Sequence, residues 1–568
     1  MRVVTFVLAA CVAMASAAGG PAWAARGGDG ELKILFWQAV STLNPYLSGG
    51  VKEEFASSIV LEPLASFNEK GELAPRLVDA LPTLENGGIA ADYTSVTWKL
   101  KLGVKWSDGS PLTADDAVFS WSYCTATGGG CAQATKFTGV KSVEALDPLT
   151  VKVTFTAPKP YPYQAFVGAT SPILQKAQFK DCLGPKAPGC TAANFGPIGT
   201  GPFKVSAFKP NDSITYVANE NYRDPNKPAF ASIALKGGGD AVSAARAVLE
   251  TGEYDYGWNI QIEPEVLKGM VDAGKGKALT AFGTYVERID LNRTAVDPAL
   301  GDKRSTLEGG PHPAMSDPAV RKALNLAIDR DVIVETGYGV AGKPTCNIIP
   351  GPEVYVSTTN DWCLKPDVAA ANKLLDDAGW KMGADGVRAK NGVKLSFQFQ
   401  TSTNSVRQAT QALLKDMWGQ IGVAVELRNI AASVFFGGDP SSPDTFQKFY
   451  ADLQMYTNFY EGADPQTYLA SWLCDKIPSP KNGWQGENYA RYCDADFDKM
   501  IAALSKSQAP AERAKLVKAL NDKLVTDGVI IPLVYRGLTL AYSNQLAGVR
   551  QSAWDSELWN IADWSRAK

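Results

Sequence analysis

The sequence predicts a mixed α/β fold, because strand-type and helix-type hydrophobic patterns alternate along its 568 residues. The chain is roughly three to four times as long as a common domain, so it needs more than one hydrophobic core. Hydrophobic residues make up 45% and charged residues 20%, which is ordinary for a folded protein. No internal repeat and no long low-complexity linker interrupts the alternation.

The first residues have the layout of an export signal. After the positive start Met1-Arg2, an apolar run extends to Ala18, and Ala22-Trp23-Ala24 fits the small-x-small cleavage pattern. We therefore expect residues 1–24 to be a cleaved signal peptide and the mature protein to be exported without an anchor. The alternative is a lipoprotein attached at Cys11, although only about eight apolar residues precede that cysteine. No later stretch has the roughly 20 apolar residues that span a bilayer.

The N-terminal half contains strands and helices in turn. Alternating apolar and polar residues over 96–102 predict a half-buried strand. Thr113 can cap the helix that follows, whose first turn is acidic. A second alternation over Leu149–Thr156 predicts another strand, and Asp240–Glu250 has the pattern of a helix.

The C-terminal half continues the same alternation. A helix is expected from Asp317, with a proline in its first turn, and another over Asp367–Ala378. Residues 395–399 alternate as a strand, and the run from Val406 to Trp418 has helical spacing. Pro510 begins a late helix with its leucines on one face.

Nine cysteines are present, and eight remain beyond the expected signal peptide. An even number in an exported chain indicates disulfides first, with buried free thiols as the alternative. Pairing of sequence neighbours is the simplest arrangement, and no couple is a CxxC motif of a zinc or redox site. The expected pairs are Cys124 with Cys131, Cys182 with Cys190, Cys346 with Cys363, and Cys474 with Cys493.

Charge and histidine content argue against several functions. Lys and Arg total 56 and Asp and Glu total 59, whereas a nucleic-acid binder normally has a basic excess. The single histidine, His312, would have to serve in any His-rich zinc site, Ser-His-Asp triad or Cys-His dyad. We therefore expect no nucleic-acid partner, no metal, no cofactor and no enzymatic activity, and a secreted hydrolase stays a remote alternative.

Three short motifs lack the context that their function needs. Gly337–Gly342 satisfies GxGxxG but follows a predicted helix rather than a strand. Lys343 and Pro344 then resemble the end of a phosphate-binding loop, but proline has neither the hydroxyl nor the N–H that this site requires. The aspartates of 494–498 resemble the start of a calcium loop that lacks its glycine, so we interpret them as an acidic helix start.

Seven distinctive segments carry a resemblance to a known family. The first is WKLKLGVKWSDGSPLTADDAVFSW (Trp98–Trp121), and six others follow in order: GTGPFKV (Gly199–Val205), NENY (Asn219–Tyr222), LETGEYDYGW (Leu249–Trp258), SDPAVRKALNLAIDR (Ser316–Arg330), ANKLLDDAGW (Ala371–Trp380) and ADPQTYLASWLC (Ala463–Cys474). In this order they resemble extracellular solute-binding protein family 5, the oligopeptide- and dipeptide-binding receptors of ABC importers. The resemblance spans residues 31–565.

The resemblance implies a bilobed periplasmic-binding-protein fold of class II, the large type with an extra subdomain. Two hinge strands would join the lobes, crossing near Tyr285–Asn292 and returning near Leu533–Leu540, and hinge closure would enclose the ligand. The implied boundaries are lobe I at 25–66, 196–288 and 535–568, its extra subdomain at 67–195, and lobe II at 289–534.

The resemblance also implies ligand-binding residues. Trp258 and Asn259 stand at the family position that lines the cleft. Arg407 begins a helix where the oligopeptide branch places a basic side chain near the peptide C-terminus, and a solvated arginine is the alternative. Glu461 falls on the family's aspartate for the peptide α-ammonium group, with Asp464 as the alternative.

The implied function is a periplasmic receptor that captures short peptides and delivers them, as a monomer, to the permease subunits of an ABC importer. The 14 Trp, 20 Tyr and 22 Phe could supply flat pocket walls for such ligands. Fold does not fix the ligand, so a same-family receptor for a nickel complex, opine, sugar or antibiotic is the alternative.

Overall fold

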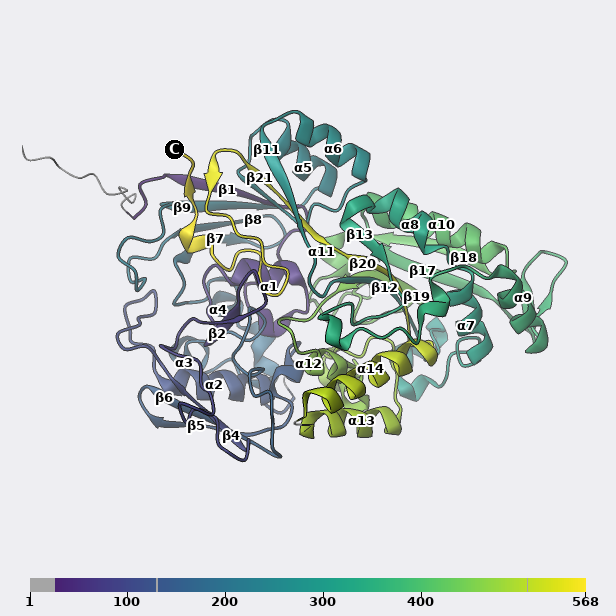
Figure 1. Cartoon of the computed structure of the whole chain (residues 1–568), viewed down its shortest axis with the longest axis horizontal. Helices are drawn as coiled ribbons and strands as arrows, with labels where there is room; N and C mark the ends of the chain where they lie inside the picture. The colour runs from purple at the N-terminus through teal and green to yellow at the C-terminus, as the bar shows by residue number, and fades with distance from the viewer. Residues whose placement is uncertain (1–25, 129–130, 508) are drawn as a thin grey trace, which may run out of the picture.

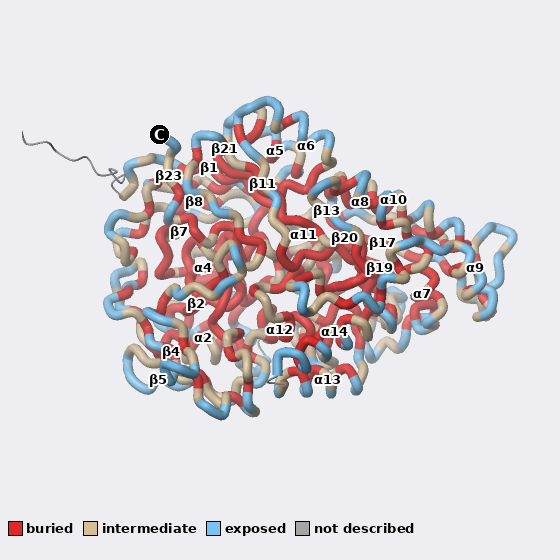
Figure 2. The backbone as a smooth tube through the Cα atoms, in the orientation of Figure 1, coloured by how far each residue is buried: buried red, intermediate tan, exposed pale blue. Residues whose placement is uncertain are grey.

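The computed structural model describes residues 26–128, 131–507 and 509–568 and has two lobes, each built around its own sheet (Figure 1). The expected signal peptide and Cys11 lie outside these residues. Buried backbone follows both sheets and the zone where the lobes meet, whereas exposed backbone lies around the outside (Figure 2). The expected bilobed α/β architecture is confirmed. Across the described ranges, no helix combines the length and apolar character needed to cross a membrane.

Lobe I contains a seven-stranded sheet. Its middle strand, β1, pairs in parallel with both neighbours, and the remaining pairs are antiparallel. In spatial order the strands are β11 (Gly276–Ala281), β21 (Leu538–Ser543), β10 (Tyr256–Trp258), β1 (Glu31–Phe36), β9 (Ser232–Gly237), β8 (Ser213–Ala218) and β7 (Phe203–Lys209). Other elements of this lobe are α1 (Val51–Ser57), α5 (Ala241–Leu249), α6 (Pro264–Asp272), β22 (Leu546–Ala547) and β23 (Ser565–Arg566).

The subdomain, at the lower left of Figure 1, has its own three-stranded sheet and core. Trp98 and Trp106 are buried in that core. The strand expected over 96–102 ends early, because β4 stops at Lys99 and Leu102 is 86% exposed. The elements are β2 (Ala65–Phe67), β3 (Leu73–Pro75), β4 (Ser95–Lys99), α2 (Ala114–Thr125), η2 (Ala134–Phe137), β5 (Val140–Asp147), β6 (Thr150–Phe155), α3 (Lys176–Phe179) and α4 (Thr191–Phe195).

Lobe II contains a six-stranded sheet, flanked by helices, at the right of Figure 1. In spatial order its strands are β13 (Gly342–Pro344), β20 (Ile530–Arg536), β12 (Val286–Leu291), β19 (Leu453–Asn458), β17 (Ser396–Ser402) and β18 (Ala424–Ile430). The remaining elements are α7 (Pro318–Leu326), α8 (Arg330–Gly337), α9 (Val368–Asp377), β14 (Lys381–Met382), β15 (Arg388–Lys390), β16 (Val393–Lys394), α10 (Ser405–Gly419), α11 (Ala432–Phe435), α12 (Gln466–Leu469), α13 (Ala495–Lys506) and α14 (Pro510–Thr526).

Helix starts in lobe II follow the capping residues of the sequence. The carboxylate of Asp317 accepts a hydrogen bond from Ala319 N at the start of α7, and that of Asp367 accepts one from Ala370 N at the start of α9. Asp494 caps α13 in the same way, which confirms an acidic helix start in place of a calcium loop. An aspartate oxygen satisfies N–H groups that the helix itself leaves free.

The chain passes between the two sheets at two neighbouring places. It leaves the lobe I sheet after β11 and enters the lobe II sheet at β12, and it returns from β20 to β21 across Gly537. A Cβ atom on Gly537 would lie 2.4 Å from Thr280 Cγ2, so a larger residue at this crossing would force Thr280 to move. The two passages run side by side, because β12 pairs with β20 and β11 with β21.

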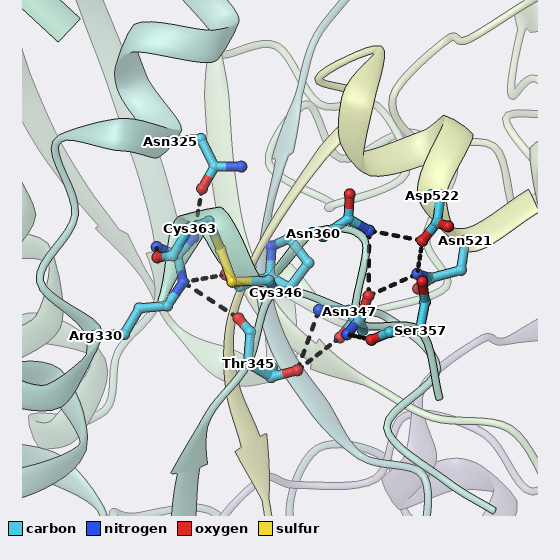
Figure 3. Close-up of a disulfide and its surroundings, with 11 residues drawn as sticks. Asn325, Arg330, Thr345, Cys346, Asn347, Ser357, Asn360, Cys363, Asn521 and Asp522 are labelled. Carbon is cyan, nitrogen blue, oxygen red and sulfur yellow. Dashed lines mark hydrogen bonds between the residues drawn. A yellow bond between two sulfur atoms is a disulfide. The ribbon is translucent and has the colours of Figure 1, made fainter. Parts of the chain in front are cut away.

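The four expected cysteine pairs are all joined as disulfides. Figure 3 shows the Cys346–Cys363 bridge in lobe II beside the buried guanidinium of Arg330. Arg330 donates to the backbone carbonyls of Thr345, Pro532 and Cys363 at 3.2, 2.9 and 2.8 Å. The bridge and the arginine therefore hold the same loop against β20, one of the two strands that connect the lobes.

Candidate ligand-binding site

Two adjoining cavities lie between the lobes. We name the first the acidic cavity, because its wall carries the carboxyl groups of Glu54, Glu461, Asp464 and Glu487. The second is the arginine cavity, whose wall carries Arg407 and Arg536. Gly49, Val51, Asn458 and Tyr489 line both, so the two cavities adjoin, and together we call them the cleft.

Glu461 extends from the loop after β19 of lobe II into the subdomain of lobe I. Its Oε2 accepts hydrogen bonds from Lys136 Nζ and Thr170 Oγ1, each at 2.6 Å, and its Oε1 accepts one from Thr170 N at 3.1 Å. Gly168 makes room for this carboxylate, since a Cβ atom there would lie 2.2 Å from Oε2. The predicted ammonium-binding residue thus already has a cationic partner from the opposite lobe.

Glu54 of α1 presents a partly unsatisfied carboxyl group to the acidic cavity. Its Oε1 accepts a hydrogen bond from Gln133 Nε2 at 2.9 Å, while its buried Oε2 has no partner in the described part of the chain. Burial raises the pKa of Glu54 to about 8, and the nearby Glu461 carboxylate adds to the rise. A cation beside Oε2 would be needed to hold this group ionised at neutral pH.

Two further carboxyl groups of the acidic cavity differ in their pairing. Asp464 receives two hydrogen bonds from Arg513, at 2.7 and 2.6 Å, and is therefore neutralised within lobe II. Glu487 accepts hydrogen bonds from Ser471 Oγ at 2.8 Å and from Thr135 Oγ1 at 3.2 Å. Burial raises the pKa of Glu487, and the hydroxyl donors oppose that rise.

Arg407 begins α10 and lines the arginine cavity, but its guanidinium is paired inside lobe II. It donates to Glu287 Oε1 at 2.7 Å and to Glu287 Oε2 at 3.2 Å, and both side chains are buried. Although burial alone would raise the pKa of Glu287, Arg407 holds it below the usual range. Arg407 is thus neither the solvated arginine of the alternative nor a free guanidinium.

Arg536, at the end of β20, is the second arginine of this cavity. It donates to Thr457 Oγ1 at 3.2 Å and also to Asn259 Oδ1. No carboxylate among the described residues lies within ion-pair distance of its guanidinium. Burial lowers the pKa of Arg536, and the charge of Glu287 opposes this effect. Its positive charge is therefore less fully compensated than that of Arg407.

Trp258 and Asn259 lie where β10 reaches the cleft. The Trp258 ring stacks on Phe36, with 4.7 Å between centroids, so it belongs to the lobe I core as well as to the wall of the arginine cavity. Asn259 has a left-handed φ of 53°, and its carbonyl accepts a hydrogen bond from Trp37 Nε1 at 2.7 Å. Contacts within lobe I therefore hold both residues in place where they line the arginine cavity.

Several polar atoms of the cleft wall are buried without a hydrogen-bond partner among the described residues. They include donors as well as acceptors, so a polar ligand could satisfy them. In the two cavities these atoms are Glu54 Oε2, Gln164 Nε2, Thr467 Oγ1, Trp258 Nε1 and Tyr285 Oη.

All five ligand-binding residues expected from the sequence line this cleft: Trp258, Asn259 and Arg407 in the arginine cavity, and Glu461 and Asp464 in the acidic cavity. Sequence reasoning missed Glu54, Lys136, Glu487 and Arg536. Each stands in a different segment, and no short motif relates them. His312 lines neither cavity; its Nε2 lies 2.7 Å from Asp452 Oδ1 within lobe II.

Residues 73–479 match the family model described as bacterial extracellular solute-binding proteins, family 5 Middle. The glutathione-binding protein GsiB of Escherichia coli O1:K1 is 23% identical over 526 residues, covering 91% of each chain.

Solved structures of similar fold cover nearly the whole chain. The oligopeptide-binding protein AppA from Bacillus subtilis, in complex with a nonapeptide, has a TM-score of 0.80 at 21% identity and covers 96% of this chain and 100% of its own. NikZ from Campylobacter jejuni, in complex with Ni(L-His), has a TM-score of 0.78 at 23% identity and covers 94% of this chain and 99% of its own.

Proposed function

Because this chain belongs to the bacterial extracellular solute-binding proteins of family 5, we propose that it captures short peptides between its lobes and delivers them to an ABC importer. The observation that carries this proposal is that the two ends of the cleft offer opposite kinds of unpaired group. The carboxyl groups of Glu54 and Glu487 in the acidic cavity have no cationic partner, and burial favours their protonated form until a cation binds beside them. An arginine without a carboxylate partner lines the arginine cavity. A short peptide carries the complementary charges at its own two ends.

The peptide ammonium group would enter the acidic cavity. Lys136 is the only lysine or arginine among the described residues of this wall, and it faces four carboxyl groups. Since Arg513 neutralises Asp464 and Lys136 neutralises Glu461, Glu54 and Glu487 remain for a ligand cation. In this proposal Glu54 Oε2 accepts a hydrogen bond from the ammonium group, which lies beside Glu461. Asp464 does not contact the ligand and keeps its ion pair with Arg513.

The peptide carboxylate would lie at the opposite end, near Arg536. A guanidinium can hold a carboxylate with two parallel hydrogen bonds. Arg407 lies on the same wall and would support this end through its charge, while its own hydrogen bonds go to Glu287. Trp258 Nε1 and Tyr285 Oη supply further hydrogen-bonding groups between the two ends.

Capture would use the two passages between the sheets as hinges. The proposed boundaries are 25–66, 196–288 and 535–568 for lobe I, 67–195 for its subdomain and 289–534 for lobe II. Strands β12 and β20, which these boundaries divide, belong whole to the lobe II sheet. We also propose that a signal peptide over residues 1–24 directs export to the periplasm. There the protein would act as a monomer and deliver its ligand to permease subunits.

A second candidate is a small solute other than a peptide. The specific observation in its favour is that Glu461, at the family's ammonium-binding position, is already paired with Lys136. The fold is also that of NikZ, whose structure holds Ni(L-His). A nickel complex, opine, sugar or antibiotic would belong to this second class.

Mass spectrometry of the small molecules that co-purify with the exported protein tests the proposal. Peptides with both termini free are the expected finding, and glutathione is the first compound to search for because of the name of the GsiB relatives. Recovery of a nickel complex, opine, sugar or antibiotic in place of peptides would overturn the proposal. Peptides added to the pure protein should be recovered intact, because a receptor does not hydrolyse its ligand.

A further inference from the structure

A third cavity opens beside the acidic cavity, and we name it the side cavity. Thr135, Gln164 and Thr467 line both cavities, so they share a wall. The side cavity lies between the subdomain and helices α12 and α13 of lobe II. The two cavities are therefore neighbours, separated only by side chains that line both of them.

Lys159 is a buried cation in the wall of the side cavity. It is 4% exposed, and its Nζ donates to Thr138 O at 3.1 Å and lies 5.4 Å from the centroid of the Phe155 ring. No carboxylate of the described residues lies within ion-pair distance of it. Burial lowers the pKa of Lys159 to about 8, opposed by the charge of Asp464. An ammonium group removed from water without an anionic partner is costly, and a ligand anion would relieve that cost.

The same wall carries hydrogen-bond donors without partners. Thr138 Oγ1, Gln164 Nε2 and Thr467 Oγ1 are all buried, and within the described chain nothing accepts or donates to them. Facing them on α13 are Asp498, whose Oδ1 also has no partner, and Lys506. Two lysines and three neutral donor groups thus stand against one aspartate, which favours a bound anion.

We propose that the side cavity binds a carboxylate carried by the side chain of the ligand's first residue. This inference rests on the proposed function, because it needs the peptide ammonium group in the acidic cavity. The side chain would pass the shared wall at Gln164 and Thr467 and place its carboxylate beside Lys159. The receptor would then prefer peptides that begin with glutamate or aspartate.

Titration calorimetry with Glu-Ala-Ala and Gln-Ala-Ala tests this preference. The two peptides have the same shape, and only the charge of the first side chain differs. A hydrogen-bonded charge contact of this kind corresponds to roughly ten-fold or more in affinity, so Glu-Ala-Ala should bind that much more tightly. Equal affinity of the two peptides would overturn the inference and leave the proposed function intact, whereas no binding of either would overturn both.

Variants assign the preference to the side cavity. Lys159→Met should bring Glu-Ala-Ala to the affinity of Gln-Ala-Ala while leaving Gln-Ala-Ala unchanged. Lys141→Met, which removes an exposed lysine of the same subdomain, should keep the preference. Thr467→Val is a milder change that should reduce the preference if Lys159→Met fails to fold. A preference that survives both Lys159→Met and Thr467→Val would contradict the inference.

Discussion

Lys136 Nζ in the subdomain of lobe I lies 2.6 Å from Glu461 Oε2 in lobe II, and both side chains are largely buried. The contact joins the two lobes directly across the acidic cavity. In the proposed function it also supplies the cation that Glu461 would otherwise take from a ligand. One ion pair therefore joins the lobes at the wall of the candidate ligand site.

The Lys136–Glu461 pair should couple to ligand binding. Glu461→Gln is expected to weaken binding of a free-amine peptide by about 2–5 kcal/mol, since it leaves Lys136 as an unpaired cation beside the ligand's ammonium group. Lys136→Met is expected to strengthen that binding, because Glu461 is then free to accept the ammonium group. The effect of Lys136→Met should differ by about 1.5 kcal/mol or more between the wild type and the Glu461→Gln background. Titration calorimetry on the four proteins measures this cycle, with Glu426→Gln on the exposed face of β18 as the control. Additive effects would show that the two residues act independently.

Glu54 should make the ligand-free protein less stable as the pH rises. Its pKa is about 8 in the folded protein against an ordinary value of 4.5, so the folded state holds a proton that the unfolded chain loses above about pH 4.5. The stabilisation from this group is complete below that pH and is lost as the pH rises through 8. Urea unfolding between pH 5 and 8.5 should give a steeper fall for the wild type than for Glu54→Gln. Parallel pH profiles for the two proteins would contradict this expectation.

Binding of an amine-bearing peptide near neutral pH should release a proton from Glu54. The free carboxyl group is largely protonated at pH 7, because burial raises its pKa to about 8. A ligand ammonium group beside Oε2 favours the charged form and lowers that pKa again. Calorimetry in buffers of different ionisation enthalpy counts the released protons, and Glu54→Gln should release fewer. The same count in both proteins would exclude Glu54 as the ammonium acceptor.

Arg407 should matter for stability more than a surface arginine does. Arg407→Met leaves the buried carboxylate of Glu287 without its partner, which is expected to cost about 3–5 kcal/mol of unfolding free energy. Adding Glu287→Leu should recover most of that loss, because the unpaired charge is then removed as well. Chemical unfolding of the single and double variants measures both effects. A loss below about 1 kcal/mol for Arg407→Met would match an exposed ion pair instead.

Local features of this fold could be predicted well from the sequence. The capping aspartates Asp240, Asp317 and Asp367 mark helix starts because their side chains satisfy backbone N–H groups next to them in the chain. The strand over 96–102 was predicted too long, since Leu102 continues the alternation but lies after the end of β4. The alternation of apolar and polar residues does not by itself show where a turn ends the strand.

The charge pairing of the cleft could not be predicted in the same way. Glu54, Lys136 and Glu461 meet only after the lobes and the subdomain have assembled, and no spacing in the chain relates them. The family resemblance placed Glu461 and Arg407 at the cleft because it relates positions in this chain to positions in the family. It did not indicate that Lys136 pairs with Glu461 or that Glu287 pairs with Arg407.

If the cleft recognises the two charged ends of a short peptide, blocking one end should abolish much of the binding. Titration calorimetry should compare Ala-Ala-Ala with its N-acetylated form at the same pH and salt concentration. Acetylation is expected to weaken binding roughly 30-fold or more, equivalent to about 2 kcal/mol, because the acidic cavity then receives a neutral amide. Equal affinity of the free and acetylated peptides would contradict it.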